Sequence, residues 1–265
     1  MKIDQKKIQN WFKNVVLQLP KLDVILKKSL SEVLIIGAGV FEIYQELGWI
    51  PPFRRKTGDI DLSVGLAHGT SDYEILRNAL LENGYTNNNH DPHYRYFSPK
   101  RIPGAMTYID LLAHPTSDQV SESQATKIMG AGPDFSFEGY AFTLLETYKI
   151  MPHLSFPNPF GVWALKKTAY LDDPIRRVKD LADIIELGSG LVEKGMHFDL
   201  GPLWMKLKTH TDAKNVRTML ADLASGESTR WDIEEARQEL LKRGYVTEAI
   251  DELLPQRLSD LVDFL

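Results

Sequence analysis

The sequence predicts an α+β fold, in which a small mixed sheet with flanking helices is followed by a helical C-terminal domain. Two observations carry this prediction. Short apolar or alternating segments bounded by turn residues recur between residues 33 and 112, and such segments are typical of strands. After about residue 137 the apolar residues follow 3- and 4-residue spacing, which is typical of helices. We therefore expect a domain over residues 1–137 and a helical domain over residues 138–265.

The first domain begins with a helical segment. Residues 5–30 show helical spacing of apolar side chains, which Pro20 interrupts. A short buried strand, Val33–Ile36, follows and ends at the turn Gly37-Ala38-Gly39. Residues 40–47 then read as a helix that opens directly from this glycine turn.

The next elements alternate strands with a helix. Ile60, Leu62 and Val64 alternate with polar residues, which is the period of a half-buried strand. Residues 72–83 predict a helix, and residues 94–97 and 107–112 predict two further strands. In the second domain the predicted helices cover residues 142–150, 160–171, 175–187, 213–223, 233–243 and 247–264, the last with a break at Pro255. Asp232 and Gly244 are expected to cap the helix near residue 233.

Composition narrows the function classes. The 265 residues include no cysteine, which excludes a disulfide scaffold, a thiol nucleophile and a thiolate zinc site. The longest apolar run, residues 33–41, is too short to span a membrane, so we expect no membrane partner. The first residues lack the apolar core of a signal peptide, and we therefore expect a cytoplasmic protein.

The glycine turn permits two interpretations. A dinucleotide-binding fold needs G-x-G-x-x-G and then an acid at the end of the second strand. Here Glu42 occupies the third glycine position, where an anion would repel pyrophosphate, and Asp59 stands at the start of its strand. We therefore prefer an interpretation in which the turn is an anion cradle at a helix N-terminus, next to a separate acidic site.

Three aspartates predict that acidic site. Asp59 and Asp61 are two residues apart on a strand, so their carboxylates lie on one face. Two neighbouring carboxylates repel each other unless a cation lies between them, and oxygen ligands of this kind suit Mg²⁺. Asp110 interrupts a strongly apolar strand, which is costly without a partner. We therefore expect Asp110 to share metal ions with the other two aspartates.

These motifs resemble a known family. The glycine turn followed by Arg55-Lys56-Thr57-Gly58-Asp59-Ile60-Asp61-Leu62 resembles the signature of the DNA polymerase β-like nucleotidyltransferase superfamily, and Asp110 fits its third catalytic strand. The nearest resemblance is to the AbiE-type abortive-infection toxin nucleotidyltransferases, which carry a downstream lysine helix and a K/R-D-x-x-D helix. Here Lys166 and the run Lys179-Asp180-Leu181-Ala182-Asp183 match them. Lys167 is a second match for the family lysine, but Lys166 has the family spacing to Ala169.

The resemblance implies a chemistry and its residues. It implies transfer of an NMP from an NTP with two Mg²⁺ ions held by Asp59, Asp61 and Asp110. Residues assigned to the nucleotide are those of the glycine turn together with others that border the triphosphate, namely Gly37, Ala38, Gly39, Arg55, Thr57, Asp180 and Asp183. Lys166 would neutralise phosphate charge in the transition state, with Asp180 and Asp183 bordering the nucleotide or orienting that lysine.

The acceptor stays open at this point. Residues 1–30 carry a net charge of +5 and residues 141–180 carry +2, whereas the whole chain carries -5. Solvated helix faces explain such segments, and so does local contact with a polyanion. The resemblance implies RNA, such as tRNA, or a protein as acceptor, and a toxin with an antitoxin partner. The alternatives are an aminoglycoside-type small-molecule nucleotidyltransferase and a non-catalytic member that binds a nucleotide or a partner.

Overall fold

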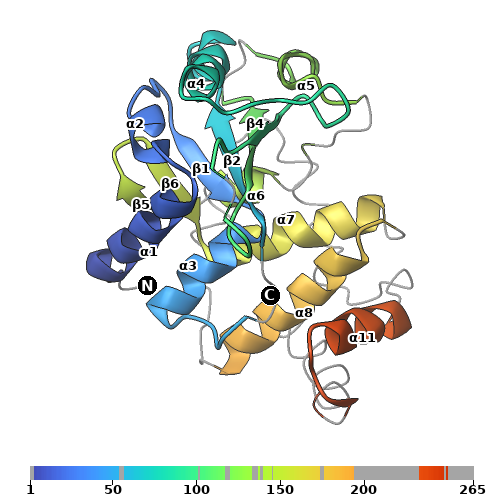
Figure 1. Ribbon diagram of the computed structural model, residues 1–265. Coiled ribbons are helices and arrows are strands. Elements are labelled where there is room, and N and C mark those ends of the chain that lie inside the picture. The colour runs from blue at the N-terminus through green and yellow to red at the C-terminus, as the bar shows by residue number, and fades with distance from the viewer. Residues whose placement is uncertain are drawn as a thin grey trace. The chain divides into compact units, whose positions relative to one another are not determined.

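A computed structural model describes most of the chain as two compact units (Figure 1). The described residues are 3–53, 57–100, 102–116, 120–132, 137, 140–144, 146–173, 176–193, 233–247 and 249. Unit 1 comprises Met1–Leu47, Lys56–Phe137 and Thr147–Pro157, and unit 2 comprises Gly48–Arg55, Glu138–Glu146 and Asn158–Leu265. The predicted boundary after residue 137 is therefore one of several points where the chain passes from one unit to the other.

Unit 1 contains a six-stranded mixed sheet, which confirms the predicted α+β class. Its strand order is β3-β4-β2-β1-β6-β5. β2 pairs in parallel with β4, β1 pairs in parallel with β6, and the other neighbours are antiparallel. The strand bounds are β1 Val33–Ile36, β2 Asp59–Gly65, β3 Arg95–Phe97, β4 Tyr108–His114, β5 Thr147–Met151 and β6 Leu154–Pro157.

Five helices of unit 1 pack around this sheet in the part of the chain that the structure describes. They are α1 Gln5–Gln18, α2 Leu22–Leu26, α3 Gly39–Leu47, α4 Ser71–Glu82 and α5 Glu122–Met129. The predicted helix over residues 5–30 is thus two helices, separated near Pro20. α1 lies against α3 and β5 (Figure 1). Its Ile8, Trp11 and Val15 side chains are buried. α5 has no counterpart among the predicted elements; Ser121 and Gln124 form a capping box at its start.

The prediction of a helix over residues 142–150 is wrong in its second half. α6 ends at Leu144, and Thr147–Met151 forms β5, an edge strand paired with β6. Along β5, Tyr148 and Ile150 are buried while Thr147 and Lys149 are exposed. The alternating segment is short, and the apolar residues before it have helical spacing. The sequence pattern therefore does not reveal where the helix ends and the strand begins.

Unit 2 is helical in its described residues. Its helices are α6 Tyr140–Leu144, α7 Pro159–Asp172, α8 Val178–Glu193 and α11 Ile233–Lys242. Asn158 caps α7, because its side chain accepts a hydrogen bond of 2.7 Å from the backbone N–H of Gly161. Gly244 ends α11 with a φ of 84°, as predicted. The predicted helices over 213–223 and 247–264, with Pro255, and the cap Asp232 lie essentially outside the described residues.

None of the described helices combines the length and the apolar character that crossing a membrane requires.

Candidate functional site

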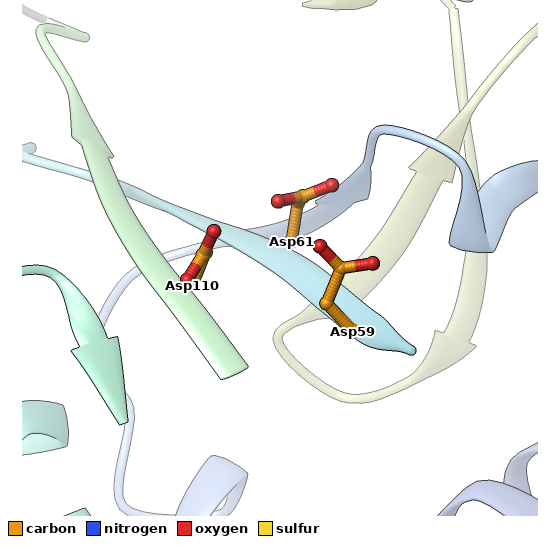
Figure 2. A group of neighbouring side chains, drawn as sticks. All are labelled: Asp59, Asp61 and Asp110. Atoms are coloured by element: carbon orange, nitrogen blue, oxygen red, sulfur yellow. The ribbon is translucent and has the colours of Figure 1, made fainter. Parts of the chain in front are cut away.

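Two parallel strands bring the three predicted aspartates together (Figure 2). Asp59 and Asp61 project from β2, and Asp110 projects from β4 on the same side of the sheet. Asp61 and Asp110 are direct register partners. One carboxylate oxygen of each aspartate lies within 4.8 Å of the others. Among the described residues this is the group of acidic and histidine side chains whose geometry suits a metal ion.

The residues around the aspartates form two rows across three strands. Asp61, Asp110 and Arg95 occupy one row on β2, β4 and β3. Asp59, Tyr108 and Phe97 occupy the next row, with the rings of Phe97 and Tyr108 5.7 Å apart. Because residues two apart on a strand share a face, both rows present their side chains on one face of the sheet. The row of three charged residues thus lies beside a row that contains Asp59 and two aromatic rings.

Arg95 forms a two-pronged ion pair with Asp110 that the sequence analysis did not predict. Its Nε and Nη2 donate to Oδ1 and Oδ2 of Asp110 at 2.8 and 2.7 Å. These hydrogen bonds raise the pKa of Arg95 above its ordinary value, so the guanidinium stays charged. In the sequence, Arg95 is a basic residue within an otherwise aromatic strand, which marks it as unusual. The sequence does not show which acidic residue it contacts, because that depends on the register between β3 and β4.

The glycine turn lies directly beside Asp61. Ile36, the last residue of β1, pairs with Asp61, and Gly37 follows it with a φ of 68°. A Cβ atom at Gly37 would stand 1.8 Å from Oδ2 of Asp61, so only glycine allows this approach. α3 begins at Gly39, and its first backbone N–H groups lie at the positive end of the helix dipole. The predicted anion cradle therefore adjoins the acidic cluster within unit 1.

Two further side chains shape the surroundings of Asp59. Thr57, a predicted nucleotide residue, donates from Oγ1 to the backbone carbonyl of Asp59 at 3.1 Å and to its carboxylate oxygen Oδ1. Burial, with the negative charge of Asp59 as a second cause, raises the pKa of Tyr108 to about 12. Tyr108 therefore keeps its proton at neutral pH. Arg55, the other predicted nucleotide residue near this strand, lies outside the described residues.

The other predicted residues gather in unit 2. Nζ of Lys166, on α7, lies 2.5 Å from Oδ1 of Asp180 and 2.8 Å from Oδ2 of Asp183, both on α8. All three side chains are buried. Asp180 and Asp183 are three residues apart on α8, so they share a helix face as expected. The side chain of Lys167 lies outside the described part of the chain.

Arg243, which no sequence pattern predicts as part of a site, extends this buried group. Its guanidinium lies 3.0 Å from Asp183 and 2.5 Å from Glu186, and it donates to the carbonyl of Lys179 at 2.9 Å. Tyr245 donates its phenol hydrogen to Glu186 at 2.6 Å. Lys166, on α7, and Arg243, just past the end of α11, thus contact different carboxylate oxygens of Asp183, Oδ2 and Oδ1.

The two groups differ in what they can bind. The three aspartates of unit 1 offer hard oxygen ligands at a spacing that fits a divalent cation such as Mg²⁺. The carboxylates of unit 2 instead contact an ammonium and two guanidinium groups, since Arg177 also lies 3.3 Å from Asp180. The second group is therefore suited to fixing a lysine rather than to binding a metal.

Comparison of the chain with models of protein families, with curated proteins and with solved structures finds no match. The interpretation of the site consequently depends on its own chemistry and on the motifs described above.

Proposed function

We propose that this protein is a Mg²⁺-dependent nucleotidyltransferase that moves an NMP from an NTP to a hydroxyl of an RNA or protein acceptor. The acceptor oxygen forms a bond to the α-phosphorus as the bond to the β-phosphate oxygen breaks, and pyrophosphate leaves. The observation that supports this best is the juxtaposition of the three aspartates with the glycine turn. The Oδ2 atom of Asp61 occupies the space where a side chain at Gly37 would be, so the metal ligands and the anion cradle are adjacent. A metal-bound triphosphate needs both features together.

Each residue of unit 1 has a defined part in this proposal. Asp59, Asp61 and Asp110 would hold Mg²⁺, which supplies charge neutralisation for the phosphates and lowers the pKa of an acceptor hydroxyl. The turn Gly37-Ala38-Gly39 presents backbone N–H groups to phosphate oxygens. Thr57 holds the Asp59 carboxylate through its hydroxyl, which restricts the orientation of that ligand.

Lys166, in unit 2, has its proposed part from the motif resemblance and not from its position relative to the three aspartates. The motif resemblance assigns it the neutralisation of charge on the reacting phosphates. Its ammonium lies 2.5 Å from Asp180 and 2.8 Å from Asp183, and these two ion pairs fix the position of the side chain. These ion pairs support one of the two expected roles for Asp180 and Asp183, namely that they orient Lys166. They do not favour the other role, direct contact with the nucleotide.

The biological role is proposed on the motif resemblance alone. The AbiE-type enzymes that the motifs resemble act as toxins, so we place this chain as the toxin of a toxin–antitoxin pair. Its partner would then be an antitoxin protein, and its acceptor would be RNA, such as tRNA, or protein.

Transfer of labelled nucleotide tests the proposal. The protein is incubated with each α-labelled NTP and Mg²⁺ in the presence of total RNA, total protein or an aminoglycoside. We expect label on RNA or protein and none after chelation of Mg²⁺. Label on the drug would instead identify a small-molecule transferase, and no label on any acceptor would identify a non-catalytic member.

Asp61→Asn links the activity to the acidic cluster. It should abolish transfer while the melting temperature stays the same or rises, because the substitution relieves repulsion between carboxylates. Asp23→Asn is the matched control, since it removes an exposed carboxylate in the same unit that pairs weakly with Lys27 at 3.9 Å. Full transfer activity of Asp61→Asn would refute the metal-site assignment.

A further inference from the structure

Arg95 holds both oxygens of Asp110, and this geometry has consequences for cation binding. The side chains are 25% and 8% exposed, so the ion pair is largely shielded from water. Bidentate contact fixes the plane of the carboxylate as well as its position. Asp110 therefore has its orientation set before any cation arrives.

Arg95 is itself held in place by unit 1. Its guanidinium lies 4.2 Å from the centre of the Tyr108 ring. Its backbone carbonyl accepts a hydrogen bond of 2.7 Å from the side chain of Asn87. Register pairing between β3 and β4 places it opposite Asp110. These contacts restrict the conformation of the Arg95 side chain, so its guanidinium has a fixed position next to Asp110.

The ion pair still leaves Asp110 able to bind a metal. A carboxylate has about four lone-pair positions, and the two hydrogen bonds from Arg95 use two of them. One oxygen of Asp110 remains within 4.8 Å of oxygens from Asp59 and Asp61 while the pair is formed. Arg95 therefore adds one positive charge next to three carboxylates without removing Asp110 from the cluster.

We propose that Arg95 is a positioning residue that orients Asp110 and lowers the affinity of the three-aspartate cluster for divalent cations. The proposal rests on the proposed function, because it assumes that the three aspartates bind metal. Two effects follow from the one contact. The fixed charge of Arg95 weakens cation binding in the absence of nucleotide, and its fork shape keeps Asp110 in the geometry needed for transfer.

Mn²⁺ binding without nucleotide tests the electrostatic effect. Free Mn²⁺ is measured by electron paramagnetic resonance, so the result does not depend on enzymatic activity. Arg95→Gln should lower the Kd for Mn²⁺ by about tenfold, because it removes a like charge close to the bound cation. Arg95→Lys keeps the charge and should bind Mn²⁺ as the wild type does. A purely structural role for Arg95 would predict weaker binding in both variants.

Two control variants accompany the Mn²⁺ measurement, one expected to leave the Kd unchanged and one expected to raise it. Arg77→Gln removes an arginine of α4 that pairs with Glu74 at 2.9 Å and hydrogen-bonds Tyr96. Tyr96 and Arg95 are consecutive on β3 and so point to opposite faces of the sheet, and this variant should leave the Kd for Mn²⁺ unchanged. Asp61→Asn should raise that Kd by at least about tenfold, because it removes a charged ligand. Melting temperatures establish that each variant is folded.

The transfer assay tests the positioning effect. Both Arg95→Gln and Arg95→Lys should lower kcat by about tenfold to a hundredfold with KM for the NTP little changed, because neither presents a fork to Asp110. Wild-type or weaker Mn²⁺ binding by folded Arg95→Gln, or wild-type kcat in Arg95→Lys, would overturn the proposal. If the Kd pattern holds but the wild type transfers no nucleotide, the cation role stands and nucleotidyl transfer fails.

Discussion

His114 lies beyond Asp110 on β4, and its imidazole is almost completely buried. Its Nδ1 lies 2.9 Å from the Ser63 hydroxyl on the neighbouring strand. Burial lowers the pKa of His114 from 6.5 to about 3, because desolvation disfavours the charged imidazolium. Below pH 6.5 the unfolded chain therefore binds a proton at this position that the folded chain does not bind.

This histidine makes the stability of the protein sensitive to acid. The folded pKa is depressed, so the free energy of unfolding should fall as pH decreases from 6.5 toward 3. His114→Gln keeps a hydrogen-bonding side chain but cannot be protonated. Relative to this variant, the wild type should lose about 2 kcal/mol between pH 7 and pH 5. Urea unfolding at both pH values measures the difference, and an equal loss in the two proteins would contradict the prediction.

At the residue scale, sequence patterns predict the acidic cluster better than its surroundings. Period-two alternation places Asp59 and Asp61 on one face, and one acid in an apolar strand singles out Asp110. Local spacing suffices for these predictions. Arg95 is different, because its contact with Asp110 depends on the antiparallel register of β3 and β4, which no local pattern encodes.

At the element scale, the error at β5 also occurs where pairing with another strand, and not local spacing, decides the structure. Strands β1, β2 and β4 carry strong local signals and lie where they were predicted. β5 is a short edge strand that follows a helical apolar pattern, and its pairing with β6 decides its conformation. The predicted helix over residues 160–171 matches α7, and the predicted end near residue 243 matches α11, each to within about two residues. Gly244 was predicted to follow the end of α11, whereas Asn158, the N-cap of α7, was not predicted.

The contact between α8 and the end of α11 contains a buried network of charged side chains in the described part of unit 2. The Arg243 side chain is 4% exposed and lies against two buried carboxylates, Asp183 and Glu186. Removing one partner of a buried ion pair leaves an uncompensated charge, which costs about 3–5 kcal/mol. Lys166 still contacts Asp183, and Tyr245 still donates to Glu186, which limits the loss.

Arg243→Gln should therefore destabilise the protein by about 3 kcal/mol, at the lower end of that range. Chemical denaturation measures the change in the free energy of unfolding. Arg237→Gln is the matched control on the same helix, because Arg237 pairs with the exposed Glu234 at 3.7 Å. That variant should lose less than about 1 kcal/mol. Equal losses in the two variants would show that the buried network contributes no more than a surface ion pair.

At the scale of the whole molecule, the charge distribution gains a physical explanation. The chain carries a net charge of -5, which by itself disfavours a polyanionic partner. Part of that negative charge is gathered in the three aspartates of unit 1, where a bound cation would neutralise it. The buried carboxylates of unit 2 are paired with Lys166, Arg177 and Arg243, so they add nothing to the net charge. The net charge therefore does not describe the surface that a nucleotide or an RNA would meet.

The division into two units predicts where Mg²⁺ changes the dynamics of the chain. A ligand that binds only the folded state stabilises the structure that contains its site, by about 2.7 kcal/mol at a hundredfold excess over Kd. Hydrogen exchange measured by mass spectrometry should therefore slow in peptides of β2 and β4 on addition of Mg²⁺, while peptides of α7 and α8 exchange as before. Chelation should reverse the effect, and Asp61→Asn should show none. Equal protection of all four elements would instead place the Mg²⁺ response outside the three-aspartate cluster.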